Sequence, residues 1–296
     1  MSKKTIQLEA IKVVPEFQPI CNKLTQKFTI SGKSKSCIDN YLREISKMVI
    51  YFNRSPLDLN IDDLDEYLCH LRANDQTPSL SCFKHLVYGL RFLYTHYHRD
   101  DMQVHLPSIK SPNTLPEIFS KQEIKSILKT PKLLKHRVMF ALIYDTGIRI
   151  SEFKNLLVSD LDLNRRSLHI RQGKGKKDRY VHFSKILARG LYKYLDACKP
   201  SVYLFNGKAK GSPMCLNGIR DAMHKVLKTC NITKKVCVHS LRHSFATHLI
   251  EEGVDLVTVK NLLGHARIDN TLMYVHIART RPKPVFSPLD MLYGTK

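Results

Sequence analysis

A proline-containing stretch divides the chain and limits the folds open to it. Residues 106–116 read Leu-Pro-Ser-Ile-Lys-Ser-Pro-Asn-Thr-Leu-Pro, with three prolines and no periodic apolar face. Proline prevents a helix from continuing and holds the residue before it in an extended conformation. We therefore expect a semi-rigid linker at 106–116, between an N-terminal domain, residues 1–105, and a second domain, residues 117–296.

The N-terminal domain has the pattern of a small helical bundle. From about Lys35, apolar residues recur at steps of three and four, as on one face of an amphipathic helix. A second helix is expected from Asn60, a suitable cap that is followed by aspartates, and a third over about 79–97. Residues 1 to about 25 show no sustained period, so a loosely held arm is expected there.

The second domain combines helices with a short pair of strands. Ser120 begins the capping box of one helix, and a longer apolar helix covers roughly 135–145. Alternating apolar residues over 167–171 and 179–183 predict two strands, which a basic, glycine-rich hairpin joins. The expected fold class is therefore mainly α, with a small antiparallel sheet in the second domain.

The chain is strongly basic. Its 48 Lys and Arg residues against 26 Asp and Glu give a formal net charge of +22 and a pI near 9.7. Each cation that meets a phosphate releases a condensed counterion, so nucleic acid is the expected partner. A hydrophobic fraction of 43% over 296 residues suffices for two cored domains, which argues against a disordered basic protein.

Membrane spans and disulfide frameworks are not expected. No apolar stretch approaches the roughly 20 residues that span a bilayer, and the polar start lacks the apolar centre of a signal peptide. We therefore expect a cytoplasmic protein with no membrane partner. The eight cysteines lack Cys-x-x-Cys pairs and are expected to be reduced. A zinc site of Cys230, Cys237, His239 and His243 is disfavoured, because the spacing of its cysteines fits no common zinc pattern.

Four short motifs in the second domain carry side chains suited to phosphate chemistry. They are Thr146-Gly-Ile-Arg149-Ile-Ser-Glu152, His239-Ser-Leu-Arg242-His, Leu263-Gly-His265 and Tyr274-Val-His. A phosphodiester under attack gains negative charge on its nonbridging oxygens, which the planar guanidinium of arginine can bind with two parallel hydrogen bonds. This ordered set of two arginines, two histidines and a tyrosine resembles the active site of the tyrosine recombinases, the site-specific integrases.

The resemblance implies a role for each of these residues. Arg149 and Arg242 would stabilise the transition state, and His239 would assist proton transfer from the tyrosine. His265 would donate a hydrogen bond to a phosphate oxygen. Tyr274 would be the nucleophile, although the family more often has threonine directly after it, where this chain has valine.

The glycine-rich hairpin is where the family carries the lysine that protonates the leaving 5′ oxygen. Lys174 in Gln-Gly-Lys-Gly matches that position, and Lys176 and Lys177 are close enough to compete. His243 and His248 are expected to pack or to support the site rather than to take part in the reaction.

The resemblance also implies the architecture and the reaction. A helical N-terminal core-binding domain and an α-rich catalytic domain with a small antiparallel β-sheet would form a clamp around double-stranded DNA. Such an enzyme cleaves and rejoins DNA through a covalent 3′-phosphotyrosyl intermediate and exchanges strands via a Holliday junction, as a tetramer on DNA. The phosphotyrosine retains the energy of the phosphodiester, so no ATP or other cofactor is expected. Arg149 and Arg242 would supply the electrostatic stabilisation, so no metal is expected either.

The expected subgroup is a compact recombinase. Without an extra arm-binding domain, the chain is similar to Xer-like and integron-like members, and Phe286-Ser-Pro-Leu-Asp290 resembles the integron and mobile-element group. Two other classes stay open. One is a catalytically inactive DNA-binding protein on the same fold, and the other is a metal-dependent nuclease that uses carboxylates such as Asp160 and Asp162.

Overall fold

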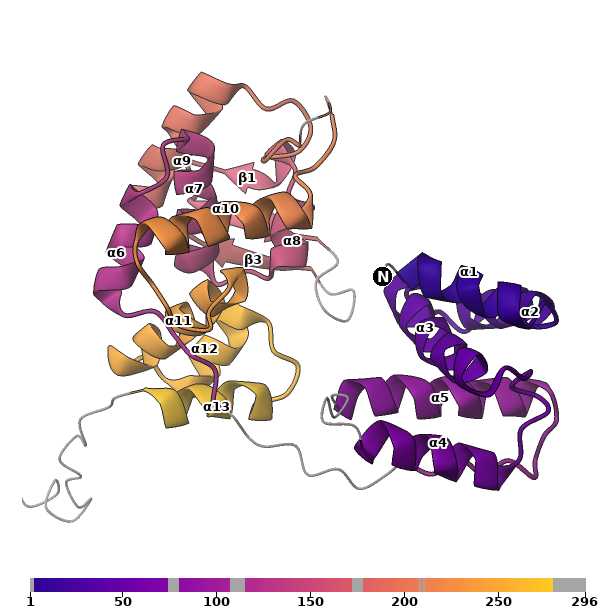
Figure 1. The fold of residues 1–296 in the computed structure, drawn as a ribbon. Coiled ribbons are helices and arrows are strands. Elements are labelled where there is room, and N and C mark those ends of the chain that lie inside the picture. Colours follow the sequence, from indigo (N-terminus) through magenta and orange to yellow (C-terminus); the bar gives the residue numbers. More distant parts are fainter. Residues whose placement is uncertain are drawn as a thin grey trace, which may run out of the picture. The chain divides into compact units, whose positions relative to one another are not determined.

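The chain divides into two compact units, each with its own core (Figure 1). The structure, a computed structural model, describes residues 3–73, 80–106, 115–171, 178–207, 209 and 211–278. The first unit is Met1–Asn113 and the second is Thr114–Lys296. The division falls within the stretch expected to be a linker, of which residues 107–114 lie outside the described part.

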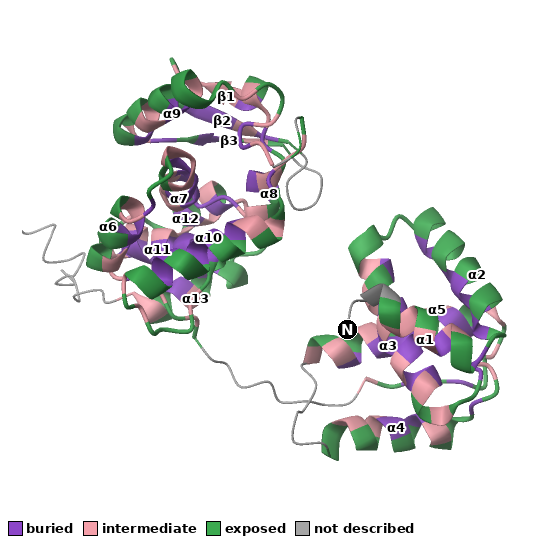
Figure 2. Cartoon of the chain, turned by 45° about the horizontal axis from the view of Figure 1, so that its top comes forward, coloured by how far each residue is buried: buried purple, intermediate pink, exposed green. Residues whose placement is uncertain are grey.

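The first unit is a helical bundle. Its helices are α1 (Lys3–Val13), α2 (Phe17–Ile30), α3 (Lys35–Phe52), α4 (Ile61–Ala73) and α5 (Leu80–His96). Helix α3 packs against α1 and α5, and Figure 2 shows their buried residues gathered in one core. The cap expected at Asn60 forms: its side chain accepts a hydrogen bond from the Asp63 amide at 2.8 Å, and the Asp63 carboxylate accepts one from the Asn60 amide at 2.9 Å.

The prediction of a loosely held N-terminal arm is wrong, because this segment forms α1 and α2. Phe17, Leu24 and Phe28 are fully buried, and the ring of Phe28 stacks on Phe92 of α5 with 3.9 Å between the ring centroids. The buried residues of α2 recur with the period of a helix, but Pro19 within this segment argues against a helix when only the sequence is considered. This proline lies in the first turn of the helix, where no helical hydrogen bond is lost.

The second unit is mainly helical and contains one small sheet. Its elements are α6 (Lys121–Lys129), α7 (Leu134–Thr146), α8 (Ile150–Lys154), the 3₁₀ turn η1 (Val158–Asp160), β1 (Leu161–Asp162), β2 (Ser167–Ile170), β3 (Arg179–His182), α9 (Lys185–Cys198), α10 (Leu216–Thr229), α11 (Val238–Glu251), α12 (Leu256–Leu263) and α13 (Asp269–Ile277). The strands pair antiparallel in the order β1, β2, β3, with Leu168 opposite both Leu161 and Val181. The predicted fold class is confirmed, although the sequence did not predict the two-residue β1. None of the described helices is long and apolar enough to cross a membrane.

Local signals place several of these elements where the sequence predicts them. The Ser120 hydroxyl accepts a hydrogen bond from the Glu123 amide at 3.1 Å, and the Glu123 carboxylate accepts one from the Ser120 amide at 2.7 Å, which completes the capping box of α6. In the strands, Leu168 and Val181 are buried while Tyr180 is exposed, as the alternation predicts.

Helix α11 is mostly buried and nevertheless carries polar side chains (Figure 2). Buried polar groups need hydrogen-bond partners. The hydroxyl of Ser244 donates to the Ser240 carbonyl and accepts from the Phe119 amide, each at 2.8 Å. Nδ1 of His248 lies 2.9 Å from the hydroxyl of Tyr144 on α7. These contacts fix α11 against α7 and against the segment before α6.

Candidate active site

The turn between α7 and α8 carries Arg149 and also binds Arg242 of α11. Helix α7 ends at Gly147, whose φ of +61° is one that glycine adopts without strain. A Cβ at this position would lie 2.4 Å from Cδ1 of Phe245, so α7 and α11 approach closely here. The Gly147 carbonyl accepts a hydrogen bond from Nη1 of Arg242 at 2.5 Å. The same turn places Arg149 at the N-cap of α8.

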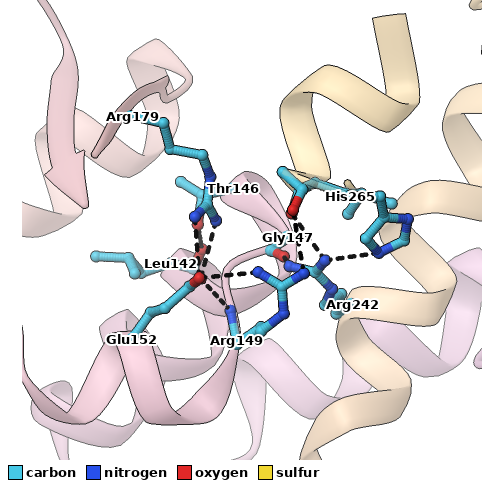
Figure 3. A network of polar contacts seen from close by, with 10 residues as sticks. Leu142, Thr146, Gly147, Arg149, Glu152, Arg179, Arg242 and His265 are labelled. Carbon is cyan, nitrogen blue, oxygen red and sulfur yellow. Dashed lines mark hydrogen bonds and ion pairs between the residues drawn. The ribbon is translucent and has the colours of Figure 1, made fainter. Parts of the chain in front are cut away.

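Glu152 holds two arginines (Figure 3). Its carboxylate accepts hydrogen bonds from both Nη atoms of Arg179, at 2.9 and 2.8 Å, and from Nη1 and the backbone amide of Arg149, both at 2.9 Å. Burial alone would raise the pKa of Glu152, but the hydrogen bonds from Arg179 and from the Arg149 backbone, together with the two positive charges, lower it to about 2. Glu152 is therefore charged at neutral pH and orients the guanidinium of Arg149, whose Nη2 also reaches the Gly264 carbonyl at 3.3 Å.

Arg242 on α11 is 1% exposed and joins the ends of two other helices. Its Nη2 donates to the Leu263 carbonyl at 2.8 Å and contacts Nε2 of His265 at 2.9 Å, while Nη1 binds the Gly147 carbonyl. Burial and the nearby charge of Arg149 lower the pKa of Arg242 to about 10, so it stays protonated at neutral pH.

The turn after α12 orients His265. Gly264 ends α12 with a φ of +64°, and His265 follows it directly. Because a guanidinium only donates hydrogen bonds, Nε2 of His265 accepts one from Arg242. The ring proton then lies on Nδ1, which donates to Oγ1 of Thr271 at 2.9 Å.

Tyr274 on α13 is 2% exposed and packs among apolar side chains of α11 and α12. These three helices lie together at one end of the second unit (Figure 1). The Tyr274 hydroxyl is 3.1 Å from Nδ1 of His243, and its ring stacks on His265 with 6.3 Å between the centroids. Burial raises the pKa of Tyr274, and the positive charges of Arg242 and Arg149 oppose that rise.

The two histidines at the start of α11 lie one turn apart. The rings of His239 and His243 meet edge to face, with 4.6 Å between their centroids. Burial and the charges of Arg242 and Arg149 lower the pKa of His239. Among the described contacts, the Tyr274 hydroxyl bonds to His243 and not to His239, although the sequence indicated only a packing or supporting role for His243. Residues at i and i+4 share a helix face, so sequence alone does not decide which of the two meets the tyrosine.

Five of the six candidate catalytic residues meet where the α7–α8 turn, α11, the α12–α13 turn and α13 come together. They are Arg149, His239, Arg242, His265 and Tyr274. The sixth, Lys174, lies outside the described residues, as do Lys176 and Lys177. Arg179 lies outside the sequence motifs, because its pairing with Glu152, 27 residues away, leaves no local signal.

Two of the groups weighed as metal ligands have other partners in the described part of the chain. The buried carboxylate of Asp160 accepts hydrogen bonds from the Leu157 amide at 2.9 Å and from Nε of Arg171 at 2.5 Å. The sulfur of Cys230 lies 3.2 Å from Oγ1 of Thr130. Among the described residues, no group of three His, Cys, Asp or Glu side chains is arranged to hold a metal ion.

Comparison with known proteins shows the family to which this chain belongs. Residues 117–281 match the phage integrase family, and residues 20–104 match the phage integrase N-terminal SAM-like domain. The chain therefore belongs to the phage integrase family and is a tyrosine-type site-specific recombinase.

Similar proteins cover nearly the whole chain. The putative integrase/recombinase y4qK of Sinorhizobium fredii is 32% identical over 276 residues, which are 93% of this chain and 89% of that protein. The tyrosine recombinase XerD of Halalkalibacterium halodurans is 29% identical over an alignment of 286 residues, and the match covers 86% of this chain and 92% of that protein.

Solved structures share the fold. XerA recombinase is 25% identical with a TM-score of 0.51, and the match covers 94% of this chain and 98% of that one. XerH bound to its difH substrate is 22% identical with a TM-score of 0.64, covering 88% and 79%. The Tn1549 transposon integrase in complex with transposon right end DNA is 16% identical with a TM-score of 0.65, covering 93% and 98%.

Proposed function

We propose that Tyr274 cleaves duplex DNA and is joined to it through a covalent 3′-phosphotyrosyl bond. The observation that carries this proposal is a buried tyrosine hydroxyl in the same hydrogen-bonded site as two guanidinium groups. Arg149 and Arg242 are both linked to the α12–α13 turn, through the carbonyls of Gly264 and Leu263. Such fixed donors stabilise charge that develops in a transition state.

In the proposed reaction, the Tyr274 oxygen attacks phosphorus, His239 assists removal of the hydroxyl proton, and the bond from phosphorus to the 5′ oxygen breaks. The five-coordinate phosphorus places extra negative charge on its nonbridging oxygens, which Arg149 and Arg242 bind. The 5′ oxygen leaves with a proton, for which Lys174 is the proposed donor. A 5′ hydroxyl from the partner strand then attacks the phosphotyrosine, which restores the phosphodiester and frees the tyrosine.

His265 changes partners in this reaction. Its Nε2 accepts a hydrogen bond from Arg242, whereas a donor role toward a phosphate oxygen requires the ring proton on Nε2. A phosphate oxygen that binds Arg242 competes with Nε2 for the same guanidinium N–H group. We therefore expect the ring proton of His265 to lie on Nε2 and to be donated to the phosphate once it is bound, while Nδ1 accepts a hydrogen bond from the Thr271 hydroxyl instead of donating one.

Double-stranded DNA is the proposed partner, and the first unit is the proposed core-binding domain. XerH is described with its difH substrate and the Tn1549 integrase with transposon right end DNA, while the net charge of +22 suits a polyanion. Exchange between two sites needs four cleavages, so we propose a tetramer on DNA that passes through a Holliday junction. Integration or excision of a mobile element is one task for such an enzyme, and resolution of chromosome dimers is another.

The test is a covalent adduct on a nicked suicide substrate made from DNA that flanks the gene, incubated in EDTA. We expect a protein–DNA band on a denaturing gel from the wild type. Tyr274→Phe should bind the same DNA in a mobility-shift assay and give no such band. An adduct formed by Tyr274→Phe contradicts the assignment of the nucleophile. Binding without an adduct by the wild type identifies an inactive DNA-binding protein, and cleavage that depends on a divalent metal identifies a nuclease.

A further inference from the structure

Arg179 is bound within the candidate active site and lies outside the motifs that define it. It begins β3, and its two Nη atoms donate hydrogen bonds to the two carboxylate oxygens of Glu152, at 2.9 Å and 2.8 Å. Such a parallel pair of bonds fixes the plane of a carboxylate as well as its position. Figure 3 shows Arg179 and Arg149 converging on the Glu152 carboxylate.

The same carboxylate sets the orientation of Arg149. One oxygen of Glu152 accepts a hydrogen bond from Nη1 of Arg149 and the other accepts one from the Arg149 amide, both at 2.9 Å. Nη2 of Arg149 contacts the Gly264 carbonyl at the longer distance of 3.3 Å. A carboxylate that turned away from Arg179 could bind both Nη atoms of Arg149 and draw them away from a phosphate. The two bonds from Arg179 oppose that rotation.

Arg179 also offsets the charge of Glu152. Glu152 is 9% exposed, so water screens its negative charge poorly. If Arg149 were the sole cation bound to Glu152, the pair would be neutral and would attract a phosphate weakly. With Arg179 bound as well, the three side chains carry one net positive charge. The charge of Arg149 is then available to a phosphate.

The backbone of β3 is held independently of the Arg179 side chain. Arg179 is paired with Ile170 of β2 in the antiparallel ladder, which fixes the start of the strand. Among the described residues, Nε of Arg179 is buried without a hydrogen-bond partner, which costs stability. The contacts of its two Nη atoms with Glu152 are therefore the interactions that hold this guanidinium.

We propose that Arg179 is a positioning residue for DNA cleavage. It holds the Glu152 carboxylate in one orientation and offsets its charge. Glu152 in turn holds the Arg149 guanidinium where it binds a nonbridging oxygen of the scissile phosphate. This inference rests on the proposed function of Arg149 and Tyr274, and it gives Arg179 no contact with the phosphate itself.

The first test compares Arg179→Gln with Arg171→Gln on the suicide substrate, at protein concentrations that saturate the DNA. Arg171 directly follows β2, and its exposed side chain binds Asp160, so it is the matched ion-paired arginine beside the neighbouring strand. We expect Arg179→Gln to slow adduct formation about 100-fold, as a small displacement of a catalytic group does, with unchanged DNA affinity. Arg171→Gln should cleave like the wild type. Equal losses in the two variants, or no loss in Arg179→Gln, overturn the proposal.

A double-mutant cycle tests whether Arg179 acts through Glu152. Once Glu152→Gln has removed the carboxylate, Arg179 has no charge to offset. We therefore expect the double variant Glu152→Gln/Arg179→Gln to cleave no more slowly than Glu152→Gln alone. A further loss as large as that of Arg179→Gln in the wild-type background would mean that Arg179 acts independently of Glu152, and the proposal fails.

A modified substrate tests the last link, from Glu152 to Arg149. A methyl group in place of one nonbridging oxygen of the scissile phosphate removes charge that an arginine would otherwise neutralise. The two diastereomers differ in which oxygen is replaced, so one should relieve the defect of Arg149→Ala more than the other. We expect the same diastereomer to relieve Arg179→Gln, which a merely structural defect would not show. Relief by the other diastereomer, by both equally or by neither rejects a role through Arg149.

Folding and the proposed function are checked in the same series. If thermal unfolding shows that Arg179→Gln is unstable, the comparisons are made with Arg179→Lys, which keeps the charge but cannot form the parallel pair of bonds. Cleavage by Arg179→Lys at the wild-type rate then overturns the proposal. If the wild type itself forms no adduct, the proposed function fails. If the wild type forms one and the Arg179 variants cleave equally fast, only this inference fails.

Discussion

Three guanidinium groups surround one carboxylate at the centre of the site. Glu152 binds Arg149 and Arg179 directly, and Arg242 lies on the far side of Arg149 close enough for their charges to repel. The side chain of Arg179 also packs closely against the turn after α12. A Cβ added at Gly264 would lie only 3.0 Å from Nε of Arg179. At the residue scale, Glu152 is therefore the group that makes this density of positive charge compatible with folding.

Replacing Glu152 by glutamine removes the negative charge that binds Arg149 and Arg179, and so tests its role in stability. We expect Glu152→Gln to lower the free energy of unfolding by about 3 kcal/mol at pH 7, because a buried ion pair that loses one partner leaves the other uncompensated. The pKa of Glu152 is depressed in the folded protein, so its contribution is complete above its ordinary value of 4.5 and is lost as the pH falls toward about 2. Urea unfolding at pH 7 and pH 3 measures this.

The difference in the free energy of unfolding between the wild type and Glu152→Gln should be smaller at pH 3 than at pH 7. The control is Glu252→Gln, which removes an exposed partner of Lys121 and should change stability little. A difference of the same size at both pH values would show that charge on Glu152 is not the cause.

At the scale of elements, the α7–α8 turn is a point where helices α7 and α11, which carry parts of the site, approach closely. Its conformation has a positive φ at Gly147, and Phe245 of α11 occupies the space where a side chain would be. The sheet contributes in a similar way, because β3 begins at Arg179, which is paired with Ile170 of β2 and bound to Glu152. The ends of the β2–β3 hairpin are thus tied to the site, which supports the proposal that a hairpin lysine acts there.

Gly147 and Gly211 both have a positive φ, but only Gly147 is crowded by neighbouring side chains. Comparing alanine at the two positions therefore distinguishes backbone strain from steric crowding. Gly147 and Gly211 have φ values of +61° and +73°, but a Cβ at Gly211 would meet nothing within 4 Å. We expect Gly211→Ala to cost about 1–2 kcal/mol, the usual strain of a left-handed residue, and Gly147→Ala to cost clearly more. Denaturant unfolding of both variants measures the difference. Equal losses would mean that Phe245 moves aside freely, and the close approach of α7 to α11 would then not be a constraint.

At the scale of the whole molecule, each unit has a separate core. The proposed exchange of strands between two DNA sites would use four copies of the chain. The residues after α13 lie outside the described part. Their sequence contains Arg281-Pro-Lys-Pro284, which stops a helix, followed by the apolar residues Val285, Phe286, Leu289, Met291 and Leu292. We propose that this segment docks on a neighbouring subunit; packing on its own unit is the alternative.

Truncation after Thr280 tests this assembly. We expect the shortened chain to bind a single DNA site nearly as well as the full chain, and to lose pairing of two sites and recombination. Native-gel mobility with a two-site substrate measures the pairing, and Tyr274→Phe is the control that should still pair sites without cleaving them. A tetrameric band from the truncated chain would reject docking in trans and favour packing on its own unit.

Short-range patterns in the sequence predicted several of the elements individually. The capping box at Ser120, the apolar period of α3 and the alternation around Leu168 depend on residues within a few positions of one another, so each could be recognised without tertiary information. The prediction failed over α1 and α2, where Pro19 interrupts an otherwise helical pattern, and at β1, which is only two residues long.

The sequence by itself determined the class of protein and the residue types of the site, because its motifs are short and contiguous. Only the tertiary structure decided which side chains meet. His243 and Tyr274 are 31 residues apart, Arg242 and Gly147 are 95 apart, and both contacts depend on how α11 packs against α7 and α13. No local pattern encodes such pairings, because they arise when the core closes and buried polar groups must find partners. For that reason the contact of Tyr274 with His243, at 3.1 Å, was not expected from the sequence, which indicated only a packing or supporting role for His243.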